Sequence, residues 1–246
     1  MIKSNSIDFP TGWLTANAFE HILQRSFHLP LLEATSCIFR FHPSCKVMVD
    51  AAVRLLSLAN QLVARGLSVT FAFDGEFNEA MGYLNRANFF TCLSSQVHII
   101  PERPDPAYAT IYQGNSKNLV EFKQLSLADS DACSSIPIQL IDALDSAMTA
   151  RSDRKQLGHM AYILFGELID NVYCHSQSSL DGFAALQVYR NGGKVLVVVS
   201  DSGVGLLETL KPKLLSPSAH HLADPALVAL LFHGDVSWEN NGRGQV

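Results

Sequence analysis

The sequence predicts a mixed α/β protein of α+β character, built from two domains. Its 246 residues exceed what one average domain needs, and 48% of them are hydrophobic, enough for a substantial core. In the first half, short β-branched or aromatic runs alternate with a helical apolar period. In the second half, a long apolar helix precedes two strands. We therefore expect one domain over 1–126 and another over 136–246.

The first half predicts alternating strands and helices. Residues 34–41 are β-branched and aromatic, as is typical of a strand. A long helical period then opens at Pro43-Ser44, where Ser44 is the expected N-cap, and Gly66 ends it. The other expected elements are a weak helix over 16–30, a strand over 67–73, a helix over about 77–87 and a strand over 97–100. This order indicates a small α/β domain.

The stretch from about 34 to 92 resembles a STAS domain, the fold of anti-sigma-factor antagonists. The resemblance lies in "IFRF", in "VARG" at the end of the long helix, in "LSVTFAF" and in "YLNRANFF". It implies a domain that binds a regulatory protein partner. In phosphorylatable STAS domains a Ser or Thr follows an Asp near the start of the first helix. Here Asp50 is followed by Ala51 and Ala52, which argues against a phosphorylation switch.

Composition restricts the partners and the compartment. The formal net charge of −5 and the pI near 6.0 argue against a large nucleic-acid-binding surface. No apolar run approaches the roughly 20 residues that cross a bilayer, and the N-terminus lacks the features of a secretory signal. We therefore expect a cytoplasmic protein without a membrane partner. The five cysteines are scattered and odd in number, which indicates reduced, mostly buried thiols.

In the second half, a helix is expected over about 137–149, after a small polar loop or linker near 126–135. Residues 155–174 then predict one long helix that is apolar on nearly every side, which is typical of a buried helix. Glu167 and Asn171 lie four residues apart and so share one face. An amide oxygen suits Mg²⁺, and a carboxylate can accept a proton from an attacking hydroxyl. The alternative is that both side chains only cap or bridge nearby backbone.

Two glycine turns follow. Residues 183–189 and 194–199 predict strands joined by a hairpin turn at Asn191-Gly192-Gly193, and the second strand leads into Ser200-Asp201-Ser202-Gly203-Val204-Gly205. A carboxylate at such a strand end can accept a hydrogen bond from the amine of adenine. Alternatively, Asp201 only caps its own turn. Near the end, Gly242 and Gly244 form a G-x-G turn, whose backbone N–H groups suit phosphate oxygens.

In order and spacing, "ELIDNVYCHS", "DSGVG" and "NGRGQ" resemble the N, G1 and G2 boxes of GHKL ATPases, the superfamily of histidine kinases, gyrase-type topoisomerases and anti-sigma-factor kinases. The resemblance covers roughly 137–246. It implies ATP and Mg²⁺ as cofactors, Glu167 as general base, Asn171 as Mg²⁺ ligand and Asp201 as adenine partner. We expect Asp170, which sits beside Glu167 and Asn171, to brace the site, and the resemblance further implies that His175 supports it. The implied hinges of the nucleotide lid are Gly203, Gly205, Gly242 and Gly244.

The GHKL resemblance also implies an α/β sandwich with a mixed sheet and closing strands after the G2 turn. This chain ends at Val246, so we expect either a fragment truncated after that turn or a partner that supplies the missing edge. GHKL domains often act as dimers, which makes a homodimer one expected assembly.

Three functions remain open at this point. The first is a regulatory protein with ATPase or protein serine kinase activity that couples nucleotide state to partner binding. The second is a non-hydrolysing, nucleotide-sensing interaction module. The third is the catalytic part of a histidine kinase, although His159 lies inside the expected ATP-site helix and cannot be the phospho-acceptor in cis.

Overall fold

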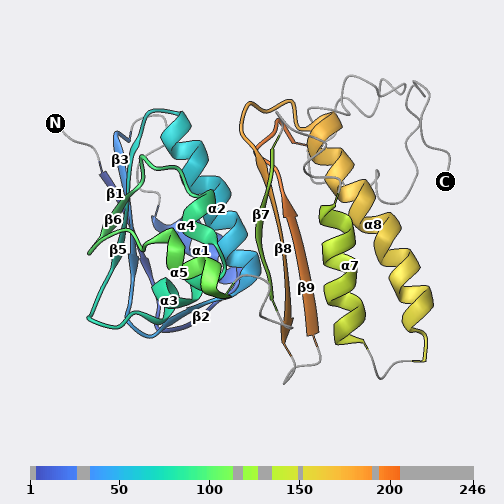
Figure 1. Ribbon diagram of the computed structural model, residues 1–246. Helices are drawn as coiled ribbons and strands as arrows, with labels where there is room; N and C mark the ends of the chain where they lie inside the picture. Colours follow the sequence, from blue (N-terminus) through green and yellow to red (C-terminus); the bar gives the residue numbers. More distant parts are fainter. Residues whose placement is uncertain are drawn as a thin grey trace.

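A computed structural model describes residues 4–26, 34–112, 119–126, 135–148, 152–189 and 194–205. Over these ranges the chain forms four layers, in the order sheet, helices, sheet, helices (Figure 1). The first sheet and the first helical layer come from the N-terminal part of the chain. The second sheet and the last two helices come from the C-terminal part. The mixed α/β class expected from the sequence is confirmed.

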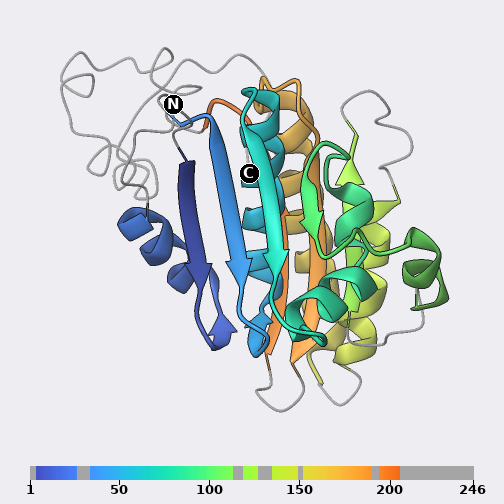
Figure 2. The same cartoon turned by 90° about the vertical axis from the view of Figure 1, so that its left-hand side faces the viewer.

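The first sheet has four parallel strands, and neighbours in the sheet follow one another along the chain. In sheet order these are β1 (Ser4–Phe9), β3 (Ser36–Phe41), β5 (Ser68–Phe73) and β6 (His98–Ile100). The helices of the domain are α1 (Ala16–Ser26), α2 (Val49–Ala64), α3 (Glu79–Arg86), α4 (Phe89–Cys92) and α5 (Pro106–Tyr112). Figure 2 shows that they lie behind the sheet, on one of its faces.

Aromatic side chains fill the space between this sheet and its helices. Buried positions of β1 and β3 alternate with more exposed ones, as a half-covered sheet requires, whereas β5 ends in three buried residues. Phe41 stacks on Phe73 with 4.4 Å between ring centroids, and Phe39 meets Phe71 edge-on at 5.3 Å. Such pairs stabilise a core by about 0.5–1.5 kcal/mol beyond the burial of their area.

The start of the long helix differs from the prediction. Cys45–Val47 form a short strand, β4, which pairs in parallel with β2 (Gly12–Leu14), so α2 begins only at Val49. Ser44 is therefore not the helix cap, and its carbonyl accepts the Gly12 N–H at 3.1 Å instead. The pairing partner lies 33 residues upstream, so a local helical period did not reveal this strand. The predicted helix end is confirmed, with Gly66 at φ +84°.

The second sheet is antiparallel over the described residues, in the order β7 (Leu119–Leu125), β8 (Gly182–Tyr189) and β9 (Lys194–Ser200). Helices α7 (Ile136–Ala147) and α8 (Arg154–His175) cover one of its faces. The mixed sheet implied by the GHKL resemblance is not found among these three strands. Strand β7 falls within the 1–126 range expected for the first domain, yet it pairs with β8.

Helix α2 packs against the other face of the second sheet, so this one helix contacts both sheets. The largest hydrophobic cluster accordingly runs from the first sheet through α2 and α4 to Phe122, Phe183 and Ala185 of the second sheet. A second cluster fills the space between that sheet and α7 and α8. The N-terminal and C-terminal parts therefore share a core.

The cysteine prediction is confirmed where the structure describes these residues. Cys37, Cys45 and Cys92 are free and buried, and Cys174 is free and exposed. Burial raises the pKa of the Cys37 and Cys92 thiols to about 12 and that of Cys45 to about 11, so these three stay protonated at neutral pH. Within the described ranges, no helix combines the length and the apolar character that crossing a bilayer requires.

Candidate functional site

Helix α8 carries the candidate catalytic residues on its outer side. Its inner side holds Ala161, Phe165, Ile169 and Val172, which are buried against α7 and the second sheet. The helix is therefore buried along one side only, whereas the sequence predicted burial all round. Glu167, Asp170 and Asn171 lie on the side away from the sheet, and all three are exposed.

The outer polar side chains of α8 are not engaged elsewhere. Glu167, Asp170 and Asn171 make no hydrogen bond or ion pair with any residue of the described ranges. The alternative that Glu167 and Asn171 bridge nearby backbone is thus not realised among those residues. Four residues of helix separate the two Cα atoms by about 6 Å along the axis, so both side chains can reach one ligand.

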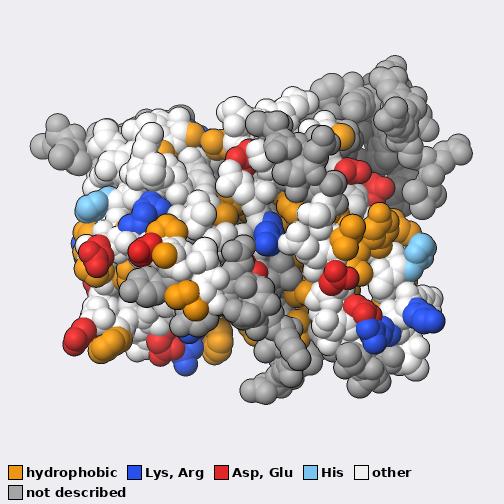
Figure 3. Space-filling model, in the orientation of Figure 1, with side chains coloured by type: hydrophobic (Ala, Val, Ile, Leu, Met, Phe, Trp, Pro, Cys, Tyr) orange, Lys and Arg blue, Asp and Glu red, His pale blue; other side chains and the backbone are white. Residues whose placement is uncertain are grey.

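Apolar side chains flank these polar groups on α8. The exposed large ones are Met160, Tyr162, Ile163, Leu164 and Leu168. Figure 3 shows apolar side chains gathered over this helix. Contiguous exposed apolar surface on a helix commonly marks a binding face. Glu167 and Asn171 therefore border apolar surface on one side.

The Asp201 turn follows directly from the end of β9. Asp201 Oδ1 accepts a hydrogen bond from the Gly203 N–H at 2.7 Å, so the expected cap of the turn by its own Asp is present. The side chain is exposed, and within the described ranges its Oδ2 atom has no partner. Capping occupies one oxygen and leaves the other available to a ligand. Gly205 has φ +86°, a conformation that favours glycine.

The Asp201 turn is attached to the C-terminal end of α8. The Val204 N–H donates to the Ser176 carbonyl at 3.0 Å. Gly203 lies so close to this point that an added Cβ would sit 2.6 Å from Ser176 Cα and nearer still to its carbonyl oxygen. Ser176 follows Asn171 by five residues, about 7.5 Å along a helix axis, and Glu167 by nine, about 13.5 Å. The Asp201 turn therefore lies at the end of the helix that carries Glu167 and Asn171.

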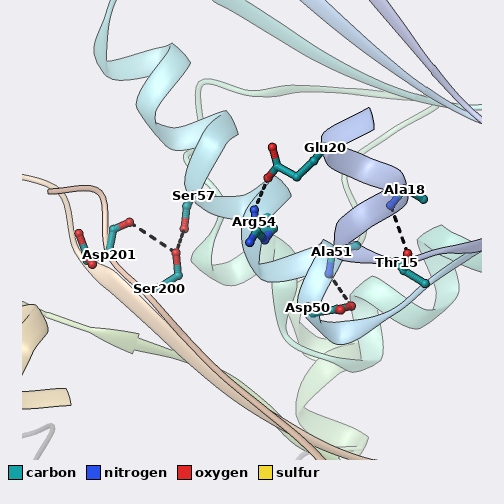
Figure 4. Close-up of polar contacts among 9 residues, drawn as sticks. All are labelled: Thr15, Ala18, Glu20, Asp50, Ala51, Arg54, Ser57, Ser200 and Asp201. Carbon is teal, nitrogen blue, oxygen red and sulfur yellow. Dashed lines mark hydrogen bonds and ion pairs between the residues drawn. The ribbon is translucent and has the colours of Figure 1, made fainter. Parts of the chain in front are cut away.

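The same turn is held from its other side by α2. Ser57 Oγ on α2 and Ser200 Oγ at the end of β9 lie 2.9 Å apart in a hydrogen bond, directly before Asp201 (Figure 4). Ser57 is buried, and its partner is 143 residues away in the chain. No local sequence signal marks either serine, because each is significant only through this long-range contact.

A second set of hydrogen bonds connects helices of the first domain with β8 of the second sheet, near the start of α2. The Tyr83 and Tyr189 hydroxyls donate to Gln187 Oε1 at 2.6 and 3.1 Å, and the Val49 N–H donates to the Tyr189 hydroxyl at 3.3 Å. Burial raises the pKa of both tyrosines, and the Asp50 carboxylate raises both further. The hydroxyls therefore keep their protons, and the Tyr189 hydroxyl of β8 accepts the first backbone N–H of α2.

Several predicted site residues lie outside the described structure. Gly242 and Gly244 fall outside the described ranges, as do the hairpin turn at 191–193 and most of the linker. His175 is the last residue of α8, but its side chain is not described. Over the described ranges, no three His, Cys, Asp or Glu side chains gather closely enough to hold a metal ion.

Comparisons of this chain with models of protein families, with curated proteins and with solved structures gave no match.

Proposed function

We propose that the second domain binds ATP with Mg²⁺ and that the protein is a regulatory ATPase or protein serine kinase of GHKL type. The observation that carries this proposal is the attachment of the Asp201 turn to the end of the helix that bears Glu167 and Asn171. Two sequence motifs that the GHKL resemblance links to one nucleotide are thereby neighbours in space. The first domain, STAS-like by sequence, would bind the regulatory partner.

Each residue of the proposed site has a separate role. Asp201 Oδ2 accepts a hydrogen bond from the adenine amine, while Oδ1 keeps the turn closed by accepting the Gly203 N–H. Glu167 accepts the proton of the attacking water or protein hydroxyl. The new bond forms between that oxygen and the γ-phosphorus, the bond to the β,γ-bridging oxygen breaks, and ADP leaves. Asp170 lies beside Glu167 on the exposed side of α8 and braces the site.

The proposed Mg²⁺ would arrive with the nucleotide. Mg²⁺ usually keeps several waters and binds to proteins through one or two side chains plus substrate phosphates. Asn171 supplies one such oxygen, which is consistent with the lack of a larger ligand cluster among the described residues. The bound ion would neutralise charge that develops on the phosphates. Asn171 would then orient the triphosphate toward Glu167 along α8.

Contacts of the Asp201 turn support a link between nucleotide and partner. The turn is hydrogen-bonded to α8 on one side, and the preceding Ser200 is hydrogen-bonded to α2 of the first domain on the other. A ligand that orders the turn therefore acts on a segment in contact with both domains. This arrangement favours a regulatory protein over an isolated hydrolase.

Calorimetry and product analysis test the proposal with two variants. Asp201→Asn keeps an acceptor for the Gly203 N–H but replaces the second oxygen with an amide donor, which cannot accept from adenine. We expect ATP affinity to fall about tenfold or more, with reduced preference for ATP over GTP. Glu167→Gln keeps shape and removes the base, so ATP binding should persist while formation of ADP or phosphoprotein stops.

Asp8→Asn is the matched control, because it removes one carboxylate from an exposed position on β1. Its ATP binding and turnover should equal those of the unsubstituted protein. If the unsubstituted protein binds ATP and Mg²⁺ but forms no ADP or phosphoprotein, the non-hydrolysing sensing module replaces the enzyme. No binding heat at millimolar ATP and Mg²⁺ would refute the nucleotide site itself.

A further inference from the structure

A hollow lies in the first domain, away from the proposed nucleotide site. It has a volume of about 740 Å³ and opens between two segments, 76–85 and 101–105. The first segment follows β5 and the second follows β6, and these are neighbouring parallel strands. The hollow therefore sits at the carboxyl ends of the strands, along the lower edge of the sheet in Figure 2. In open parallel sheets this is the edge at which ligands usually bind. We call this hollow the β5–β6 groove.

Hydrogen bonds hold both walls of the groove in place. Asn78 caps α3 by accepting the Met81 N–H at 3.2 Å, and its amide donates to the carbonyls of Phe41 and Asp74 at 3.1 Å each. In the other wall, the Arg103 guanidinium donates to the carbonyls of Phe90, Ser94 and Val97. A preformed wall lowers the ordering cost of binding.

The groove carries an excess of negative charge. Four carboxylates line it, together with Arg103, whose donors are used by backbone carbonyls. Glu79 is paired with Lys46 at 3.5 Å, and Asp105 accepts the Ala107 N–H at 2.8 Å. Within the described ranges, Glu76 and Glu102 have neither a hydrogen bond nor an ion pair, and both are exposed. These two carboxylates therefore line the groove without a paired cation from the described residues.

Apolar side chains accompany this charge. Phe77 is 84% exposed, and Met81, Pro101 and Pro104 add to the lining. Figure 3 shows acidic and apolar side chains next to each other at the lower left, over the first domain. An aromatic face beside free carboxylates suits a guanidinium or ammonium group, which gains both ion pairs and a cation–π contact. Phenylalanine is also enriched in protein interfaces.

We propose that the β5–β6 groove binds a segment of a partner protein that carries Arg or Lys next to an apolar residue. The cation lies between Glu76 and Glu102, and the apolar residue packs on Phe77. The two kinds of lining together fit a peptide better than a free cation, which would leave Phe77 and the prolines exposed. This proposal depends on the first domain alone and does not require the nucleotide site.

Selection from a random twelve-residue peptide library against the full chain tests the proposal. Enriched peptides should carry Arg or Lys beside an apolar residue. The most enriched peptide, labelled with fluorescein, is then titrated by fluorescence anisotropy. Glu76→Gln combined with Glu102→Gln should weaken its binding at least tenfold, and Phe77→Ala at least fivefold. Raising the salt concentration should weaken binding to the unsubstituted protein.

The matched control combines Asp8→Asn with Glu20→Gln, which changes net charge equally at exposed positions outside the groove. It should bind the peptide like the unsubstituted protein. All substituted side chains are exposed, so thermal melting should confirm intact folds. The proposal is overturned if enriched peptides lack an excess of Arg and Lys, or if they bind the groove variant and the control equally. Displacement of the peptide by spermine at equal concentration would assign the groove to small cations instead.

Discussion

At the scale of single residues, Gly203 of the second domain is required because another backbone segment packs against it, and not because of its backbone conformation. Gly203 meets the backbone of Ser176 so closely that no side chain fits between them. A contact also limits Asp201. Its Oδ1 atom accepts the Gly203 N–H that closes the turn, so only Oδ2 remains for a ligand. Both residues were expected in a nucleotide site from sequence, but their contacts with Ser176 and Gly203 define what each can do.

Gly203→Ala should therefore destabilise the protein. The added Cβ must push the turn away from α8, which we expect to lower the free energy of unfolding by about 1–3 kcal/mol. Gly158→Ala is the control, because Gly158 lies in α8 with open space around its Cβ position. It should raise stability by about 0.5–1 kcal/mol, since alanine favours the helix. Urea unfolding of both variants checks this, and equal stability of Gly203→Ala and the parent would contradict the packing.

At the scale of elements, α8 combines two unlike sides. Its inner side completes a hydrophobic cluster, and its outer side presents Glu167 and Asn171 among apolar residues. From sequence the helix looked apolar all round, because Met160, Ile163 and Leu164 on the outer side match the residues of the inner side. Only the position of the sheet distinguishes the two sides, so the prediction of a fully buried helix was wrong.

The two sides of α8 should respond differently to truncation. Phe165 is 3% exposed and Met160 is 58% exposed. Phe165→Ala should lower the free energy of unfolding by about 3–5 kcal/mol, because it empties a packed site. Met160→Ala should change it by less than about 0.5 kcal/mol. Chemical unfolding followed by circular dichroism measures both values. A large decrease in the free energy of unfolding for Met160→Ala would mean that the outer side of α8 is covered.

At the scale of the whole molecule, the two domains are built as one packed unit. Helix α2 contacts both sheets, and Phe122 of β7 enters the cluster of the first domain, where its ring meets that of Phe89 edge-on at 5.8 Å. The Phe122 N–H also donates to the Ala87 carbonyl at 2.8 Å. We therefore expect the domains to unfold together.

Phe122→Ala tests this cooperativity. Phe122 is fully buried, so its truncation should cost about 3–5 kcal/mol. In a Trp238→Phe background, fluorescence reports on Trp13 in the first domain, and circular dichroism reports on the whole chain. Both should shift to the same lower urea midpoint in one transition. Ile138→Ala, at an exposed position on α7, should leave the midpoint unchanged. Two separate transitions would show that the domains unfold independently.

The sequence by itself determined most of the helices and strands and the candidate residues Glu167, Asn171 and Asp201, because apolar periods and glycine turns are local features. It did not reveal β1. In this strand of six residues the inward Asn5, Ile7 and Phe9 alternate with polar residues, and so short an alternation does not stand out in the sequence. Tertiary structure alone decided that β4 occupies the first residues of the expected helix, so that α2 begins later. It also decided that β7 pairs in the second sheet and that Ser57 is hydrogen-bonded to Ser200. These features depend on contacts between residues far apart in the chain, and such contacts form only when the layers pack together.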